Sequence, residues 1–113
     1  MRLLDTTTLQ LKEFFDPPEY AILSHRWEGG EVSFEEYSLV LQDARYDDEQ
    51  RATQPWLAER AEQAQEIRLR TGYSKIRHFC RIARDMGLNW AWIDTCCIDK
   101  RSSAELSEAI NSM

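Results

Sequence analysis

The feature that most constrains the fold is an amphipathic helix pattern followed directly by a strand that is apolar on both faces. Apolar residues recur on one helical face between Tyr73 and Met86, and Gly87 stands where a helix is expected to end. The run Trp90–Asp94 then has the composition of a central parallel strand, whose two faces are both covered. We therefore expect its two tryptophans to be core residues. The predicted core face of the helix comprises Tyr73, Ile76, Phe79, Cys80, Ile82, Ala83 and Met86.

A second strand is predicted further upstream. Tyr20–Ser24 is short, apolar and bounded by Pro18 and by polar residues, which is typical of a buried strand. Strand, helix and strand in this order form a βαβ unit with parallel strands. The fold class predicted from this order is α/β, a parallel sheet with flanking helices.

The remaining N-terminal half gives weaker signals. Residues 3–15 alternate irregularly and end at a Pro-Pro breaker, and Val32–Tyr37 is a short element of uncertain type. Residues 39–70 are rich in Ala, Glu, Gln and Arg but poor in core-type residues. High helix propensity without a wide apolar stripe predicts an exposed helical insertion, or else a mobile loop, at 39–70.

The C-terminal segment predicts one more helix. Ser102 and Glu105 have the spacing of a capping box, and apolar residues recur at helical spacing up to Met113. This helix has no stop signal, and a third parallel strand would be expected to follow it. We therefore expect 1–113 to be the N-terminal part of a larger α/β domain, truncated after the second core helix and of marginal stability alone.

Composition excludes several classes of protein. The net charge of −6 argues against nucleic-acid binding, and the only basic stretch, around Arg77, Arg81 and Arg84, is expected to be a solvated helix face. No apolar run approaches the roughly 20 residues of a membrane span, and the N-terminus does not resemble a signal peptide. The three cysteines lack disulfide or zinc spacing, so we expect no metal and a reducing, cytoplasmic location.

A candidate site follows from the strand order. In parallel sheets, ligands gather at the carboxyl ends of the strands. The first strand leads into Ser24, His25, Arg26 and Trp27, and the second ends at Asp94, so these residues are expected to face one crevice. Asp94 either anchors the next loop by accepting backbone N–H bonds or contacts a ligand.

Two nucleophile hypotheses compete with simpler alternatives. Ser24 and His25 are adjacent on a strand and point to opposite faces, so a Ser-His enzyme is disfavoured. Cys96 or Cys97 could be a nucleophile if a positive environment lowered its pKa. The simpler expectation is that one of these two cysteines packs inward while the other lies at the loop surface.

Three stretches together resemble the fungal heterokaryon incompatibility (HET) domain. They are YAILSHRW at 20–27, GYSKIRHFCRIARDMGLNWAWIDTCCIDK at 72–100 and SSAELSEAINSM at 102–113. Residues 39–70 match no family motif, and Arg26 stands where the family often has Thr. The resemblance implies a domain of non-self recognition in fungal innate immunity, whose activation triggers programmed cell death.

The same resemblance implies a fold and a mode of action. HET domains are thought to be remote relatives of Toll/interleukin-1 receptor (TIR) domains, which implies a flavodoxin-like sheet. TIR domains assemble through the loop that corresponds here to Thr95, Cys96, Cys97, Ile98, Asp99, Lys100 and Arg101. Self-association and a receptor-type protein partner are therefore expected.

Some TIR domains cleave NAD, which leaves an enzymatic alternative open for the complete domain. NAD would then be a substrate, not a cofactor, with Arg26 pairing with a phosphate and Trp27 stacking on a ring. Neither Glu105 nor Glu108 matches the catalytic glutamate of those TIR domains, so the catalytic residues are unknown. A third alternative is an inactive, truncated product.

Overall fold

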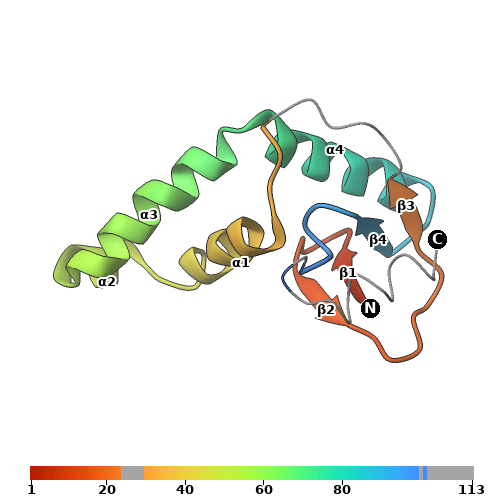
Figure 1. The fold of residues 1–113 in the computed structure, drawn as a ribbon, viewed down its shortest axis with the longest axis horizontal. Coiled ribbons are helices and arrows are strands. Elements are labelled where there is room, and N and C mark those ends of the chain that lie inside the picture. Colours follow the sequence, from red (N-terminus) through yellow and green to blue (C-terminus); the bar gives the residue numbers. More distant parts are fainter. Residues whose placement is uncertain (24–29, 100, 102–113) are drawn as a thin grey trace.

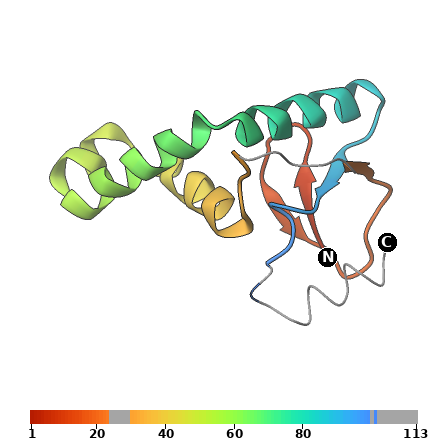
Figure 2. The same cartoon turned by 45° about the horizontal axis from the view of Figure 1, so that its top comes forward.

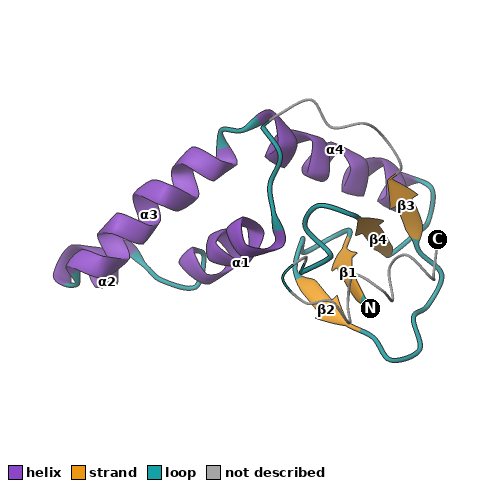
Figure 3. Ribbon diagram, viewed as in Figure 1, coloured by secondary structure: helices purple, strands orange, loops and turns teal. Residues whose placement is uncertain are grey.

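The structure is a computed structural model, and it describes residues 1–23, 30–99 and 101. The described part contains a four-stranded sheet and four helices (Figure 3). The strands are β1 (Arg2–Asp5), β2 (Leu11–Glu13), β3 (Ala21–Leu23) and β4 (Trp90–Ile93). The helices are α1 (Phe34–Asp43), α2 (Asp48–Thr53), α3 (Pro55–Arg68) and α4 (Thr71–Asp85).

The sheet is mixed, with strand order β2-β1-β4-β3. β3 and β4 are parallel neighbours, with Leu23 opposite Ile93, which confirms the predicted parallel pair. β1, however, pairs antiparallel with both β4 and β2. The expectation of a purely parallel sheet is therefore wrong for the described strands, because an N-terminal hairpin occupies the side of β4 away from β3 (Figure 1).

The N-terminal hairpin falls where the sequence predicts no element. Leu3 and Leu4 are both fully buried, because β1 lies between two strands and both of its faces are covered. Its turn is held by the Asp5 carboxylate, whose Oδ1 accepts the Thr7 N–H at 2.8 Å and the Thr8 N–H at 3.1 Å. Leu9 then adopts a positive φ of 63°. This backbone conformation is uncommon for leucine, so the sequence does not predict a turn there.

Helix α4 packs its predicted face on the sheet, although the buried stripe is narrower than expected. Ile76, Cys80 and Ala83 are almost fully buried, whereas Ile82 is 43% and Met86 72% exposed. Because successive helical residues are about 100° apart, Ile82 lies about 120° around the helix from Ile76 and falls outside the buried stripe. Met86 follows the last residue of the helix. The helix ends as predicted, with Gly87 at a φ of 84°. Trp92 is buried, and Trp90 packs edge-on against Phe14 with ring centroids 4.7 Å apart.

Residues 39–70 are helical. They contain the end of α1 and all of α2 and α3, and α3 packs along α1 through buried Leu57, Ala64 and Ile67. Figures 1 and 2 show α2 and the adjoining part of α3 extending away from the sheet as an arm. The segment is therefore helical and not a loop, but the expectation that it is exposed is wrong for Leu57, Ala64 and Ile67, which pack inward. Its status as an insertion stays a prediction.

Buried Asp43, the last residue of α1, joins this helix to α2 and α3. Its Oδ1 lies 3.2 Å from Arg51 Nε of α2, and its Oδ2 lies 3.0 Å from an Arg68 guanidinium nitrogen of α3. The predicted helix at 102–113 lies outside the described residues. In the described ranges, no helix combines the length and apolar character needed to cross a bilayer.

Candidate site at the carboxyl end of the parallel strands

The carboxyl ends of β3 and β4 lie at the same edge of the sheet. Ala21 pairs with Ala91 and Leu23 with Ile93, so both strands end at one level. Asp94 follows β4 directly; it is partly buried and engaged in an interaction. The residues proposed to share this crevice from the β3 side, Ser24, His25, Arg26 and Trp27, lie outside the described part of the chain. The crevice of five residues therefore stays a prediction.

The loop after β4 has a tightly packed base. The Cys97 N–H donates to the Ile93 carbonyl at 2.9 Å, and the Ile93 N–H donates to Cys97 Sγ at 3.4 Å. Cys96, Cys97 and Ile98 are all buried in the core cluster. The expectation that one of the two cysteines would lie at the loop surface is wrong, because the turn folds back on its own strand and carries both inward.

Burial makes the Cys80 and Cys96 thiols poor nucleophiles. It raises the pKa of Cys80 to about 12 and the pKa of Cys96 well above its ordinary value, since a thiolate is not solvated in the core. All three cysteines are free thiols. The cysteine-nucleophile alternative thus finds no support, and the vicinal pair is better explained as core packing. In the described residues, no group of three His, Cys, Asp or Glu side chains could hold a metal ion.

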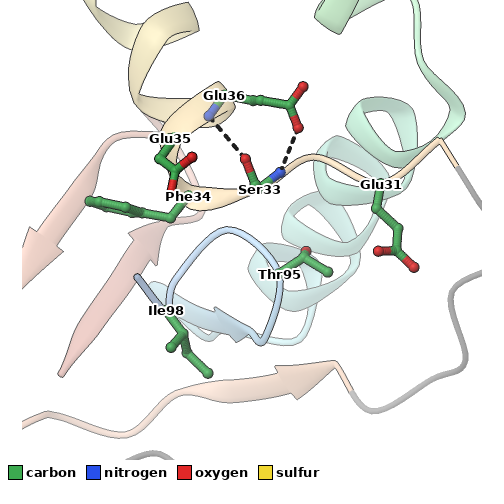
Figure 4. Close-up of a pocket in the computed structure, with 7 residues that line it drawn as sticks. All are labelled: Glu31, Ser33, Phe34, Glu35, Glu36, Thr95 and Ile98. Atoms are coloured by element: carbon green, nitrogen blue, oxygen red, sulfur yellow. Dashed lines mark hydrogen bonds between the residues drawn. The ribbon is translucent and has the colours of Figure 1, made fainter. Parts of the chain in front are cut away.

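A hollow of about 210 Å³ opens between this loop and the start of α1 (Figure 4). Thr95 lines it from the loop and is only 6% exposed, yet its Oγ1 has no hydrogen-bond partner among the described residues. A buried hydroxyl without a partner costs free energy, so it marks a place where a polar group can be accommodated. The lining consists of Glu31, Ser33, Phe34, Glu35, Glu36, Thr95 and Ile98.

The α1 side of the hollow is built by a capping box. Ser33 Oγ accepts the Glu36 N–H, and the Glu36 carboxylate accepts the Ser33 N–H, each at 3.2 Å. Partial burial by itself would raise the pKa of Glu36, but hydrogen bonds from Ser33 and Arg70 outweigh it and lower the pKa. The hollow is therefore acidic, which favours a cationic or hydrogen-bond-donating group and disfavours direct contact with a phosphate.

The exposed end of the loop is tied to the same helix. Arg101 Nε lies 2.7 Å from Glu35 Oε1 and 3.0 Å from Asp99 Oδ1, and the Arg101 N–H also donates to Asp99 at 3.1 Å. The hydrogen bonds from Arg101 lower the pKa of Asp99. The loop thus has a buried apolar base and a charged end, while Lys100 lies outside the described residues.

Sequence reasoning missed the α1 side of this site. The pattern Ser33-Phe-Glu-Glu36 is a readable capping box and predicts a helix start, but nothing in it places that start beside Thr95. The contact between Glu35 and Arg101 joins residues far apart in the chain and depends on the assembled fold.

The comparisons with known proteins agree with the sequence resemblance. The family profile described as "Heterokaryon incompatibility protein (HET)" matches residues 20–113. The chain is 39% identical over 98 residues to "Vegetative incompatibility protein HET-E-1" from Podospora anserina, which covers 85% of this chain and 5% of that protein. The chain thus spans a small fraction of the length of this relative. No solved structure matches the chain significantly. On the family match and the identity to this relative, the chain belongs to the fungal heterokaryon incompatibility (HET) family.

Proposed function

We propose that this chain is a cytoplasmic signalling module that self-associates through the loop Thr95–Arg101 and thereby triggers fungal cell death. A receptor-type partner would bring copies together on non-self recognition. Family membership supports a role in heterokaryon incompatibility. The assembly step is the new part of the proposal.

The construction of the loop is the observation that carries the proposal. Cys96, Cys97 and Ile98 are buried, so the base of the loop is fixed on the core. The far end presents Arg101, whose side chain is 66% exposed, next to Asp99 and Glu35. A rigid base loses little conformational entropy on association, and a surface with both charge signs can pair with a second copy of itself.

One observation favours an enzymatic alternative, the cleavage of NAD. The predicted crevice for this activity consists of Ser24, His25, Arg26, Trp27 and Asp94. The parallel β3–β4 pair ends beside the hollow that Thr95 lines, where ligands of parallel sheets gather. The glutamates of that hollow weigh against it, because they repel phosphates.

The test is growth arrest in fungal cells that express the full-length protein under an inducible promoter. Asp99→Ala and Lys100→Ala each remove one charge from the loop and are expected to reduce growth arrest at equal expression. Glu59→Ala is the matched control, because it removes an exposed carboxylate from α3 and is expected to leave growth arrest unchanged. Cellular NAD is measured in the same cultures.

The outcomes separate the two functions. Loss of growth arrest in the loop variants with NAD unchanged in every culture supports the signalling module. Growth arrest that persists in both loop variants contradicts the assembly role of the loop. A fall in NAD before growth stops, seen with the parent protein and the control, would favour the enzymatic alternative.

A further inference from the structure

A second concave surface lies away from the loop. A groove of about 520 Å³ runs between α4 and the turn that joins β1 to β2. Arg77, Arg81 and Arg84 line it from α4, and Thr7 lines it from the turn. The Thr6 N–H donates to the Asn89 carbonyl, so this turn lies at the amino end of β4. Thr95 follows the carboxyl end of the same strand, at the opposite side of the sheet.

The three arginines concentrate positive charge along one face of α4. They follow one another at i, i+4 and i+7, so they stand one above the other on a single helical face. All three are exposed, and none forms an ion pair with a described residue, unlike Arg51, Arg68 and Arg70. Like charges one turn apart repel each other, so an anion that bridges them would relieve this repulsion.

We propose that this groove binds a small molecule that carries several phosphate groups. Guanidinium groups match phosphate oxygens with paired N–H donors, and three in a row provide for more than one phosphate. Ser74 and Thr7 add hydroxyl groups, while Tyr73 and Leu9 offer apolar surface on which a ring of the ligand can rest. The volume falls in the range of roughly 300–1,000 Å³ that is typical of small-molecule sites.

Two properties favour a small ligand over a nucleic acid. The part of α4 that lines the groove, from Ser74 to Arg84, is only about 15 Å long. A surface of this length is small for a nucleic-acid interface, which buries about 1,000 Å² or more. The chain as a whole carries a net charge of −6, which would repel an extended polyanion. The groove shares no lining residue with the hollow at Thr95, so this proposal stands independently of the assembly loop.

The experiment is isothermal titration calorimetry of the full chain with inorganic tripolyphosphate at constant ionic strength. Arg81→Gln, in the middle of the row, is expected to weaken binding by about tenfold or more. Arg81→Lys keeps the charge but loses the paired donors, so an intermediate loss is expected. Arg45→Gln is the matched control, since it removes one exposed arginine outside the groove. Circular dichroism confirms that each variant is folded.

Each outcome bears on the proposal. Weakening by Arg81→Gln but not by Arg45→Gln supports it, whereas equal weakening by both indicates diffuse charge attraction and overturns it. Tighter binding of a short RNA or DNA through the same arginines would also overturn it. Vesicles containing phosphoinositides identify the source of the phosphates. If they bind through Arg81 and tripolyphosphate displaces them, a lipid headgroup supplies the phosphates; if they do not bind, the ligand is a free one.

Discussion

The contact between Gly72 and Gly30 leaves no room for a side chain. The Gly72 N–H donates to the Gly30 carbonyl at 2.8 Å, and a Cβ on Gly72 would come within 2.2 Å of that oxygen. Gly72→Ala is therefore expected to lower the free energy of unfolding by about 2 kcal/mol or more. Gly87→Ala is the control: nothing lies within 4 Å of its Cβ position, so only its positive φ opposes the change, at about 1 kcal/mol. Urea unfolding followed by tryptophan fluorescence checks both values, and equal losses would contradict the close approach.

The buried Cys80 thiol makes stability depend on alkaline pH. Its pKa rises from an ordinary value of 9.0 to about 12, so the unfolded chain loses this proton first as pH increases. Stability from this group is complete below about pH 9 and is lost as pH rises through about 12. Between about pH 8 and pH 10, Cys80→Ala should lose on the order of 1 kcal/mol less stability than the parent protein. Urea titrations at the two pH values measure this difference, and parallel losses would show that the native thiol ionises normally.

The helical arm depends on Asp43 more than on any apolar stripe in α2. This carboxylate is 3% exposed and pairs with Arg51 of α2 and Arg68 of α3. Asp43→Ala is expected to lower the free energy of unfolding by about 3 kcal/mol, because it removes two charge-assisted bonds and leaves Arg68 without its carboxylate partner. Asp48→Ala removes a fully exposed partner of the same Arg51 and should cost far less, since solvent screens an exposed ion pair. Chemical denaturation checks both, and equal costs would mean that the buried pairs do not hold the arm.

An element can be predicted from the sequence when a local pattern of residues specifies it. The parallel β3–β4 pair and α4 could be predicted, because an apolar run and a helical stripe are local patterns. The β1–β2 hairpin could not, since Leu3 and Leu4 are both buried and therefore break alternation, and Leu9 makes the turn without a glycine. Helical spacing predicts that Ile82 and Met86 are core residues, but spacing does not reveal how wide the covered stripe is, and both side chains are exposed.

Only part of the candidate site can be predicted from the sequence, because local patterns specify only part of it. The edge formed by β3 and β4 follows from strand order, and Asp94 comes directly after β4. The acidic hollow depends on α1 starting beside Thr95, and the inward position of both Cys96 and Cys97 depends on a turn that folds back on β4. Such placements arise from contacts between distant segments.

Taken as one molecule, the chain has three separate surfaces around the sheet: the loop Thr95–Arg101, the basic groove along α4 and the helical arm. Of these, Figure 1 shows the arm extending away from the sheet. The loop combines a base of buried Cys96, Cys97 and Ile98 with both charge signs at its exposed end. For this reason we assign assembly to the loop and not to the arm.

Sedimentation velocity over a range of protein concentrations is the direct test of assembly through the loop. We expect the parent protein and Glu59→Ala to shift to larger species as concentration rises, while Asp99→Ala stays monomeric over the same range. An Asp99→Ala variant that assembles at the same concentrations as the parent protein would contradict this expectation.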